Sequence, residues 1–439
     1  IAVVRAMRTP TFDCQTEAVF NSVVGVTRKG LAVDDATFLS CPDLIPRHWP
    51  NAKGSPVTSI RLFKAWSSDW PSERKRPAWQ QFHKFLEENN AKVLVGTQIS
   101  CDEAADDIDW DNVLEMLKMF GPARVMGIAV GNELELLQFK DGVTTACVQR
   151  LWGTPAKEGY IWQKIQERAS DLDQLPGFET VPVTTVMTGA IMAEFPFAKG
   201  SPTMAARVQQ LFTSVVAKFG RRWVFSINIY PYFDPGNNVD VGTTDKCTGA
   251  LSRSLCFSGK ACLLQGTLTS MRQRMRFVST TADILWVTET GWSSPQADTL
   301  SGQPISTCDD FSSAASFQTY YSNFLAWDLS AGVEQGPDHA FYFTIRDSDN
   351  FGVNEHFGLV EECGSKWCKI DGLTTPWKSF KGRRAPTSPR SAACKTCGHH
   401  PGCTGLAGSC CPTHEGVLPR SCAAPAGWPK DTNASIRTF

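Results

Sequence analysis

The chain has 439 residues, of which 42% are hydrophobic and 20% are charged, and its net charge is −1. This length suffices for one large domain of about 250–350 residues with appendages, and the composition is that of a globular protein. The near-neutral charge gives no reason to expect nucleic acid or an anionic membrane as a partner. No apolar run reaches the roughly 18–20 residues that span a bilayer.

The start of the chain is unusual because its first residue is Ile1 rather than Met, so we expect that a processed N-terminal segment precedes it. Residues 1–18 are interpreted as an N-terminal extension. The apolar run Val19–Val26 is the best candidate for a first strand, because a helix fits between it and the next apolar run at Val57.

From about residue 57 to residue 360, short apolar runs alternate with longer amphipathic stretches. The runs are almost continuously hydrophobic, which is typical of parallel strands covered on both faces. The predicted strands are Val57–Phe63, Lys92–Thr97, Val125–Gly131, Val181–Thr188, Trp223–Tyr232, Ile284–Thr290 and Ala340–Ile345. The predicted helices include Trp79–Glu88, Trp110–Phe120, Met204–Phe219 and Ser313–Leu329.

With Val19–Val26 these runs make eight strands, and the alternation with helices predicts an α/β fold, a (β/α)8 TIM barrel over residues 19–379. The alternative is an open doubly wound sheet. It is disfavoured because no glycine-rich phosphate turn follows any strand; the turn Gly131-Asn132-Glu133 supplies a carboxylate instead.

Two regions of different composition follow the barrel. Residues 380–392 are basic and rich in proline and serine, and are predicted to be a linker. Residues 393–439 form a cysteine-rich tail. The Cys394-x-x-Cys397 spacing, with His399 and His400 nearby, is compatible with zinc binding. We favour a small disulfide-bonded module, because Cys410 and Cys411 are adjacent in a Gly- and Pro-rich context.

The cellular location is predicted from the cysteines, 16 in total. An even and high count of this kind is typical of proteins that form disulfides outside the cytosol. The sequence Asn433-Ala434-Ser435 is a potential N-glycosylation site, although such triplets also arise by chance. We therefore expect a secreted or cell-surface glycoprotein.

Two of the predicted strands end in glutamates. Glu133 follows the apolar run that begins at Val125, and Glu289 lies near the end of the run that begins at Ile284. A strand buried on both faces normally excludes a carboxylate, because removing the charge from water costs several kcal/mol. On the fourth and seventh strands of a barrel, both glutamates would reach the C-terminal face, where active sites of this fold lie.

Two converging carboxyl groups are the catalytic groups of most glycoside hydrolases. One protonates the leaving oxygen, and the other attacks the anomeric carbon or activates water. The alternative is structural: each glutamate pairs with an arginine or caps a helix. The spacing of the residues favours catalysis but leaves both interpretations open.

Four motifs occur in an order that supports catalysis: Gly131-Asn132-Glu133, the run Asn228-Ile-Tyr-Pro-Tyr-Phe233, the run Glu289-Thr-Gly-Trp-Ser-Ser294 and His356-Phe-Gly-Leu359. Together they resemble glycoside hydrolase family 17, the β-1,3-glucanases and related glucanosyltransferases. Two further runs, Ser59–Phe63 and Val93–Gly96, look like that family's second and third strands. The resemblance covers roughly residues 57–360.

The resemblance implies a (β/α)8 barrel and a retaining double displacement without metal or organic cofactor. It assigns Glu133 as general acid/base and Glu289 as nucleophile. Asn132 is then placed to bind the sugar 2-hydroxyl, and Arg61 and Tyr230 to donate hydrogen bonds to Glu289 and keep it charged. For Arg61 and Tyr230 the alternative is simple packing in the barrel.

Trp292 follows the predicted nucleophile closely, and we expect its face to stack on a pyranose ring. On the last strand the family usually shows Phe-Asp-Glu or Phe-Asn-Glu followed soon by a lysine. Here the run is Phe343-Thr-Ile-Arg-Asp347, so Asp347 is the candidate for the family's auxiliary acid, next to Arg346 and with no lysine at the family's spacing. This departure leaves the substrate linkage open.

Two cysteine-bearing insertions, Cys247–Cys262 and Gln296–Asp309, are expected beside the active site. The tail resembles a short Cys-rich module found on secreted proteins of marine algae and related protists; carbohydrate binding, protein docking and bracing of the barrel are its candidate roles. For the whole protein three hypotheses remain: a β-1,3-glucanase acting on laminarin- or callose-like polymers, a β-1,3-glucan transglycosylase, and a non-catalytic component of an extracellular assembly.

Overall fold

The computed structural model describes residues 22–370, with gaps at 53, 141, 155–156, 190, 192–203, 234–245, 296–307, 333, 351–352 and 366–367. The predicted N-terminal extension, the linker 380–392 and the cysteine-rich tail 393–439 lie outside the described residues.

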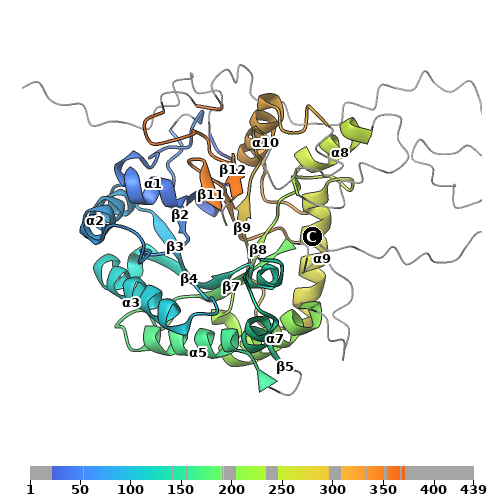
Figure 1. Cartoon of the computed structure of the whole chain (residues 1–439). Helices are drawn as coiled ribbons and strands as arrows, with labels where there is room; N and C mark the ends of the chain where they lie inside the picture. Colours follow the sequence, from blue (N-terminus) through green and yellow to red (C-terminus); the bar gives the residue numbers. More distant parts are fainter. Residues whose placement is uncertain are drawn as a thin grey trace, which may run out of the picture.

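Eight parallel strands close into a barrel in the order β1-β10-β9-β8-β7-β4-β3-β2 (Figure 1). These strands are β1 Lys29–Val33, β2 Ser59–Leu62, β3 Lys92–Thr97, β4 Val125–Asn132, β7 Val183–Thr188, β8 Phe225–Asn228, β9 Leu285–Thr290 and β10 His339–Tyr342. Neighbouring strands follow one another in the chain, and the first pairs with the last. The predicted (β/α)8 TIM barrel is confirmed.

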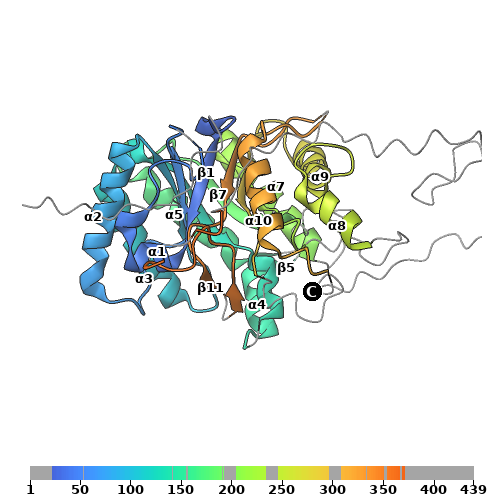
Figure 2. The same cartoon turned by 90° about the horizontal axis from the view of Figure 1, so that it is seen from above.

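The helices surround this barrel (Figure 1), and the view turned by 90° shows helices on both sides of the strands (Figure 2). They are α1 Asp35–Ser40, α2 Ser72–Glu88, α3 Glu103–Phe120, α4 Thr145–Trp152, α5 Tyr160–Asp173, α7 Met204–Phe219, α8 Lys246–Leu255, α9 Leu263–Val278 and α10 Ala314–Ala326. Short 3-10 helices are η1 Val26–Arg28, η2 Pro42–Leu44, η3 Pro122–Arg124, η4 Leu134–Phe139 and η5 Gly220–Arg222. Two hairpins, β5 Gly153–Thr154 with β6 Lys157–Glu158 and β11 Ser348–Asn350 with β12 Val353–Glu355, complete the described elements.

The first strand differs from the prediction. Residues 22–26 of the predicted run Val19–Val26 are not extended: Gly25 adopts a left-handed conformation, and the side chain of Val24 is 43% exposed. The strand is instead Lys29–Val33, buried along its whole length. This strand is hard to recognise in the sequence because its first residue, Lys29, is charged. The Lys29 ammonium is tolerated in the core because it donates to three carbonyl oxygens, those of Phe324, Leu325 and Trp327.

The barrel interior is filled by a separate apolar cluster, which consists of Leu94, Ala129, Val186, Val224, Trp286 and Phe341. Two strand glycines make room for the large rings in it. A Cβ atom on Gly127 would lie 3.0 Å from the Trp286 ring, and one on Gly30 would lie 2.6 Å from the Phe341 ring. Since this core fills the barrel, polar chemistry is confined to the strand ends.

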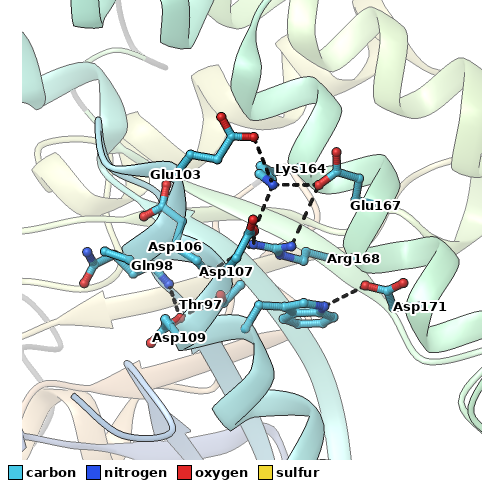
Figure 3. A network of polar contacts seen from close by, with 12 residues as sticks. Thr97, Gln98, Glu103, Asp106, Asp107, Asp109, Lys164, Glu167, Arg168 and Asp171 are labelled. Atoms are coloured by element: carbon cyan, nitrogen blue, oxygen red, sulfur yellow. Dashed lines mark hydrogen bonds and ion pairs between the residues drawn. The ribbon is translucent and has the colours of Figure 1, made fainter. Parts of the chain in front are cut away.

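Outside the barrel, a polar network joins α3 to α5 and to the end of β3 (Figure 3). Lys164 and Arg168 of α5 both bond to Asp107 of α3, at 2.8 and 2.9 Å. Asp109, also on α3, accepts from the Thr97 hydroxyl at 2.8 Å and from the backbone N–H of Gln98 at 2.7 Å. These contacts fix the two helices against the strand that lies next to β2 and β4 in the barrel.

Four disulfides in which both cysteines are described fasten the segments around the strands: Cys41–Cys363, Cys101–Cys147, Cys247–Cys308 and Cys256–Cys262. The third links the two predicted cysteine-bearing insertions to each other, since Cys247 begins one and Cys308 is the last residue but one of the other. None of the helices described is both long and apolar enough to cross a membrane.

Candidate active site

Six polar side chains meet at the C-terminal ends of four barrel strands. Glu133 follows β4 directly and Glu289 lies on β9, the fourth and seventh strands of the barrel. Their neighbours are Arg61 of β2, Asn132 at the end of β4, Asn228 at the end of β8, and Tyr230 two residues beyond it. The structure therefore brings together five of the seven side chains that the sequence singled out, together with Asn228.

Glu289 is only 6% exposed and accepts hydrogen bonds on both carboxylate oxygens. Its Oε1 accepts from Arg61 Nη1 at 2.5 Å and from Asn228 Nδ2 at 2.8 Å, and its Oε2 accepts from the Tyr230 hydroxyl at 2.5 Å. Arg61 is itself 2% exposed, so this is a buried ion pair. Three hydrogen-bond donors therefore converge on one carboxylate.

Asn228 connects the two glutamates. Its Nδ2 lies 2.9 Å from Glu133 Oε1 and 2.8 Å from Glu289 Oε1, so these two oxygens cannot be farther apart than 5.7 Å, the sum of the two distances. Its Oδ1 accepts from Arg61 Nη1 at 3.1 Å and from the Thr288 hydroxyl at 2.8 Å. This pattern fixes the amide orientation, because a flipped amide would point N–H groups at the Arg61 donor.

The backbone at the end of β4 sets the position of Glu133. Gly131 has φ +78°, and a Cβ atom there would lie 2.6 Å from the Leu134 side chain. Glu133 itself is left-handed, with φ 49° and ψ 41°, and its N–H donates to the carbonyl of Val186 on β7 at 2.8 Å. A non-glycine residue in this region is strained by about 1 kcal/mol or more, which is typical of functional positions.

The two glutamates have different surroundings. Burial, the Glu289 carboxylate and the Glu135 carboxyl raise the pKa of Glu133 to about 8, and the Asn228 bond and the Arg61 charge oppose this. Glu133 keeps part of its surface exposed, whereas Glu289 is buried. One carboxyl therefore holds a proton near neutral pH, while the other is surrounded by donors.

Tyr230 remains a neutral donor, because burial and the adjacent Glu289 raise its pKa well above the usual value of 10.0. Its ring packs edge-on against Phe357, with the ring centres 5.3 Å apart, and lies 6.1 Å from that of Phe343. Phe343 in turn contacts Phe63, whose ring lies 4.4 Å from the Arg61 guanidinium carbon. Aromatic rings thus flank two of the three donors to Glu289, Arg61 and Tyr230.

Trp292 does not match its predicted role. Its side chain is 0% exposed, and its indole N–H donates to the Phe311 carbonyl at 2.8 Å. The ring packs against Tyr232, Phe311 and Tyr320, with ring centres 4.8 to 5.2 Å apart. The prediction that its face stacks on a sugar is therefore wrong in this structure, because protein atoms cover that face.

Asp347 lies in the segment after β10 and takes part in a second polar cluster. Both of its carboxylate oxygens are 2.7 Å from Lys369 Nζ, Oδ2 lies 3.4 Å from His356 Nδ1, and Oδ1 accepts from the Gly358 N–H at 2.7 Å. Burial raises the pKa of Asp347, and Lys369 opposes this. None of these partners belongs to the network of Glu289. Lys369 lies 22 residues after Asp347 in the chain.

Asn228 and Thr288 were not predicted from the sequence as site residues, although Asn228 begins one of the quoted motifs. A signal for Asn228 was present: it is the polar end of an apolar strand, like Glu133 and Glu289. Within the described ranges, no group of three or more His, Cys, Asp or Glu side chains is arranged to hold a metal ion.

Comparisons with known proteins support the fold. No family model matches the chain, and no curated protein matches it in sequence. Among solved structures it is similar to CJP38, a β-1,3-glucanase and pollen allergen of Cryptomeria japonica, at 15% identity and a TM-score of 0.50, over 76% of this chain and 95% of that one.

Two further structures align less closely. A β-1,3-glucanosyltransferase mutant of Rhizomucor miehei, solved with laminaritriose, aligns at 15% identity and a TM-score of 0.40, over 70% of this chain and 82% of that one. A β-glucosidase of Thermotoga maritima aligns at 12% identity and a TM-score of 0.40, over 69% and 77%. The likeness to CJP38 establishes that this chain shares its (β/α)8 barrel fold.

Proposed function

We propose that this protein is a retaining glycoside hydrolase that cleaves β-1,3-glucan. The observation that carries the proposal is the single Asn228 amide group bonded to both Glu133 and Glu289. It limits the separation of the two oxygens to 5.7 Å. Retaining enzymes hold their carboxyl groups about 5–5.5 Å apart, whereas inverting enzymes need about 6.5–9.5 Å to admit a water molecule.

The different surroundings support a division of roles. Glu133, with its raised pKa, is the general acid/base, and Glu289, held charged by Arg61 and Tyr230, is the nucleophile. A purely structural ion pair would explain Glu289, which has an arginine partner. It would not explain Glu133, which accepts from an amide rather than a cation and occupies a strained backbone position.

In the first step, a Glu289 oxygen forms a bond to the anomeric carbon as the glycosidic C–O bond breaks, and the Glu133 proton passes to the leaving oxygen. In the second step, Glu133 takes a proton from water, whose oxygen displaces Glu289 from the anomeric carbon. Glu289 loses negative charge as it bonds to the anomeric carbon. Its three hydrogen-bond donors stay in place during this step. Asn132, whose Oδ1 is held by Arg61 at 2.6 Å, is proposed to bind the sugar 2-hydroxyl.

The choice of β-1,3-glucan rests on the ordered motifs around Glu133, Asn228 and Glu289, and on the activity named for CJP38. A laminarin- or callose-like polymer cleaved within the chain is the proposed substrate. An extracellular location is proposed from the four disulfides that tie the barrel segments together. Asp347 is proposed to shape the substrate site through its cluster with Lys369.

The test is hydrolysis of laminarin by the protein and by Glu289→Gln and Glu133→Gln, with Glu87→Gln on the outer helix α2 as the matched control. We expect each active-site substitution to lower kcat by at least about 10³-fold and the control to be unaffected. Azide should partly restore Glu289→Ala by attacking from the vacated side, and the product should then carry the inverted configuration. Hydrolysis that survives Glu289→Gln at the unmodified rate would overturn the mechanism.

The product mixture separates the remaining hypotheses. Oligosaccharides longer than the laminari-oligosaccharide supplied would identify a transglycosylase that uses the same two residues. Absence of any bond cleavage or transfer by the unmodified protein, with laminarin binding retained, would identify a non-catalytic glucan-binding component.

A further inference from the structure

One exposed aromatic side chain lies in the segment that follows the proposed acid/base. Phe139 is the last residue of η4, the 3-10 helix that begins directly after Glu133, and it is 50% exposed. In the described part of the chain, the other exposed residue among the phenylalanines, tyrosines and tryptophans is Phe277 of α9, at 67%. Single exposed apolar residues are common on protein surfaces, so exposure alone assigns neither residue a role.

The two phenylalanines lie on opposite faces of the barrel. Phe277 is the last residue but one of α9, which ends shortly before β9 begins at Leu285. It is therefore on the face where the strands begin. Helix η4 follows the C-terminal end of β4, so Phe139 is on the face that carries the two proposed catalytic glutamates.

Helix η4 is fixed against the barrel along its length. Leu134 is 3% exposed, and Leu137 packs against the main apolar core. Between them, Glu135 Oε1 accepts from the backbone N–H of Thr188, the last residue of β7, at 2.5 Å. Because its inner side is held in this way, the helix presents Phe139 at a defined place relative to the acid/base.

The end of η4 remains near Glu133. A 3-10 helix rises about 2 Å per residue, so Phe139 lies about 12 Å beyond Glu133 along the helix. The next residue, Lys140, is partly buried; burial lowers its pKa, and the Glu133 charge opposes this. The chain that follows Phe139 is therefore still within electrostatic reach of the acid/base.

The mechanism proposed above gives this position a meaning. Glu133 delivers its proton to the leaving oxygen, so the sugar units beyond that oxygen lie on the Glu133 side of the cleaved bond, and those before it lie on the Glu289 side. Pyranose rings carry C–H groups on their faces and pack on apolar aromatic surfaces. Trp292, which was expected to provide such a surface, is covered by protein atoms.

We propose that Phe139 is a sugar platform on the leaving-group side of the site, on which a glucosyl unit beyond the first one after the cleaved bond stacks. This assignment rests on the proposed function, because it takes Glu133 as the acid/base. The same surface receives an acceptor sugar in the second step, so Phe139 also favours transfer to glucan over hydrolysis.

The test compares two kinds of substrate. A long laminari-oligosaccharide places glucosyl units on both sides of the cleaved bond. An aryl β-laminarioside has a leaving group too short to reach a ring about 12 Å away. Phe139→Ala should lower kcat/KM on the oligosaccharide by roughly five- to thirtyfold, mainly through KM, and on the aryl substrate by less than about twofold. Phe139→Trp keeps an aromatic face and should restore the value on the oligosaccharide.

Phe277→Ala is the matched control, since it removes the same ring from an exposed position on the opposite face. It should leave both substrates unaffected. An equal loss on both substrates in Phe139→Ala would overturn the proposal, because that is the result of a structural role. An unchanged value on the oligosaccharide would overturn it as well.

Binding separates a failure of this proposal from a failure of the proposed function. If the unmodified protein cleaves neither substrate, the proposed function is refuted. Isothermal titration of laminarihexaose then tests the platform alone: weaker binding to Phe139→Ala than to Phe277→Ala would support it. Equal affinity of the two variants, or no binding by the unmodified protein, would refute the platform too.

Discussion

Asn228→Asp is the substitution that tests the hydrogen-bond network most directly. The two side chains have nearly the same shape, so packing is retained, but the Nδ2 donor becomes an acceptor. The bonds of 2.9 Å to Glu133 and 2.8 Å to Glu289 are then lost, and a third carboxyl faces both glutamates.

The magnitude follows from these two contacts. A hydrogen bond contributes about 1.5–3 kcal/mol to a charged group such as the Glu289 carboxylate, and about 0.5–1.5 kcal/mol to a neutral one such as the protonated Glu133, so the loss of both removes roughly 2–4.5 kcal/mol. Since about 1.4 kcal/mol changes a rate tenfold, kcat/KM on laminarin should fall by roughly 30- to 1,000-fold. The Arg61 bond to the new carboxyl compensates part of this, because it becomes a salt bridge.

The assay is kcat/KM on laminari-oligosaccharides, with circular dichroism and thermal unfolding to show that the barrel is intact. Asn112→Asp on α3 is the matched control, because Asn112 already accepts from Lys75 at 3.0 Å and lies outside the network. A loss of less than tenfold in folded Asn228→Asp would refute the view that this amide organises the two glutamates.

Three further predictions concern stability. Trp292→Phe should lower the free energy of unfolding by about 1–3 kcal/mol and leave KM unchanged, because the indole is a core group bonded to Phe311; urea unfolding and laminarin kinetics check this. Lys29→Met should cost about 2–4 kcal/mol in the same unfolding assay, because three carbonyls lose their donor. Glu133→Gln should become more stable relative to the unmodified protein as pH rises from 4.5 to about 8, measured as the difference in Tm. The folded unmodified protein holds the Glu133 proton more tightly than its unfolded chain does, so the unmodified protein loses stability across this window. The variant does not lose it, because glutamine does not titrate.

The parts of the fold that could be predicted are those whose signal is local in the sequence. The strands Lys92–Thr97 and Val125–Asn132 are continuous apolar runs, and each was found within one residue of its observed ends. The helix Met204–Phe219 matched at both ends, because its apolar residues recur at helical spacing. The strand Lys29–Val33 was missed because its first residue is charged, and the carbonyl groups that accept hydrogen bonds from this side chain lie nearly 300 residues away.

The same distinction applies to the site. Glu133 and Glu289 could be recognised because a carboxylate at the end of an apolar strand is anomalous whatever lies around it. The placement of Trp292 could not, because its neighbour Phe311 and the helix residue Tyr320 cover the ring only after the chain has folded. Asp347 likewise has a lysine partner, but no spacing rule identifies Lys369 from 22 positions away.

Asn228 shows why the chemistry of a site can exceed what its residue types suggest. An asparagine is neutral and common at strand ends, so the sequence marks it weakly. Its importance comes from the two ends of one amide: the oxygen is held by Arg61 and Thr288, so the nitrogen points toward both carboxyls and toward the Asn132 Oδ1, which lies 3.3 Å away. An aspartate there would add charge and a leucine would leave the carboxylates unbonded. The amide alone can join an acid that must hold a proton to a nucleophile that must not.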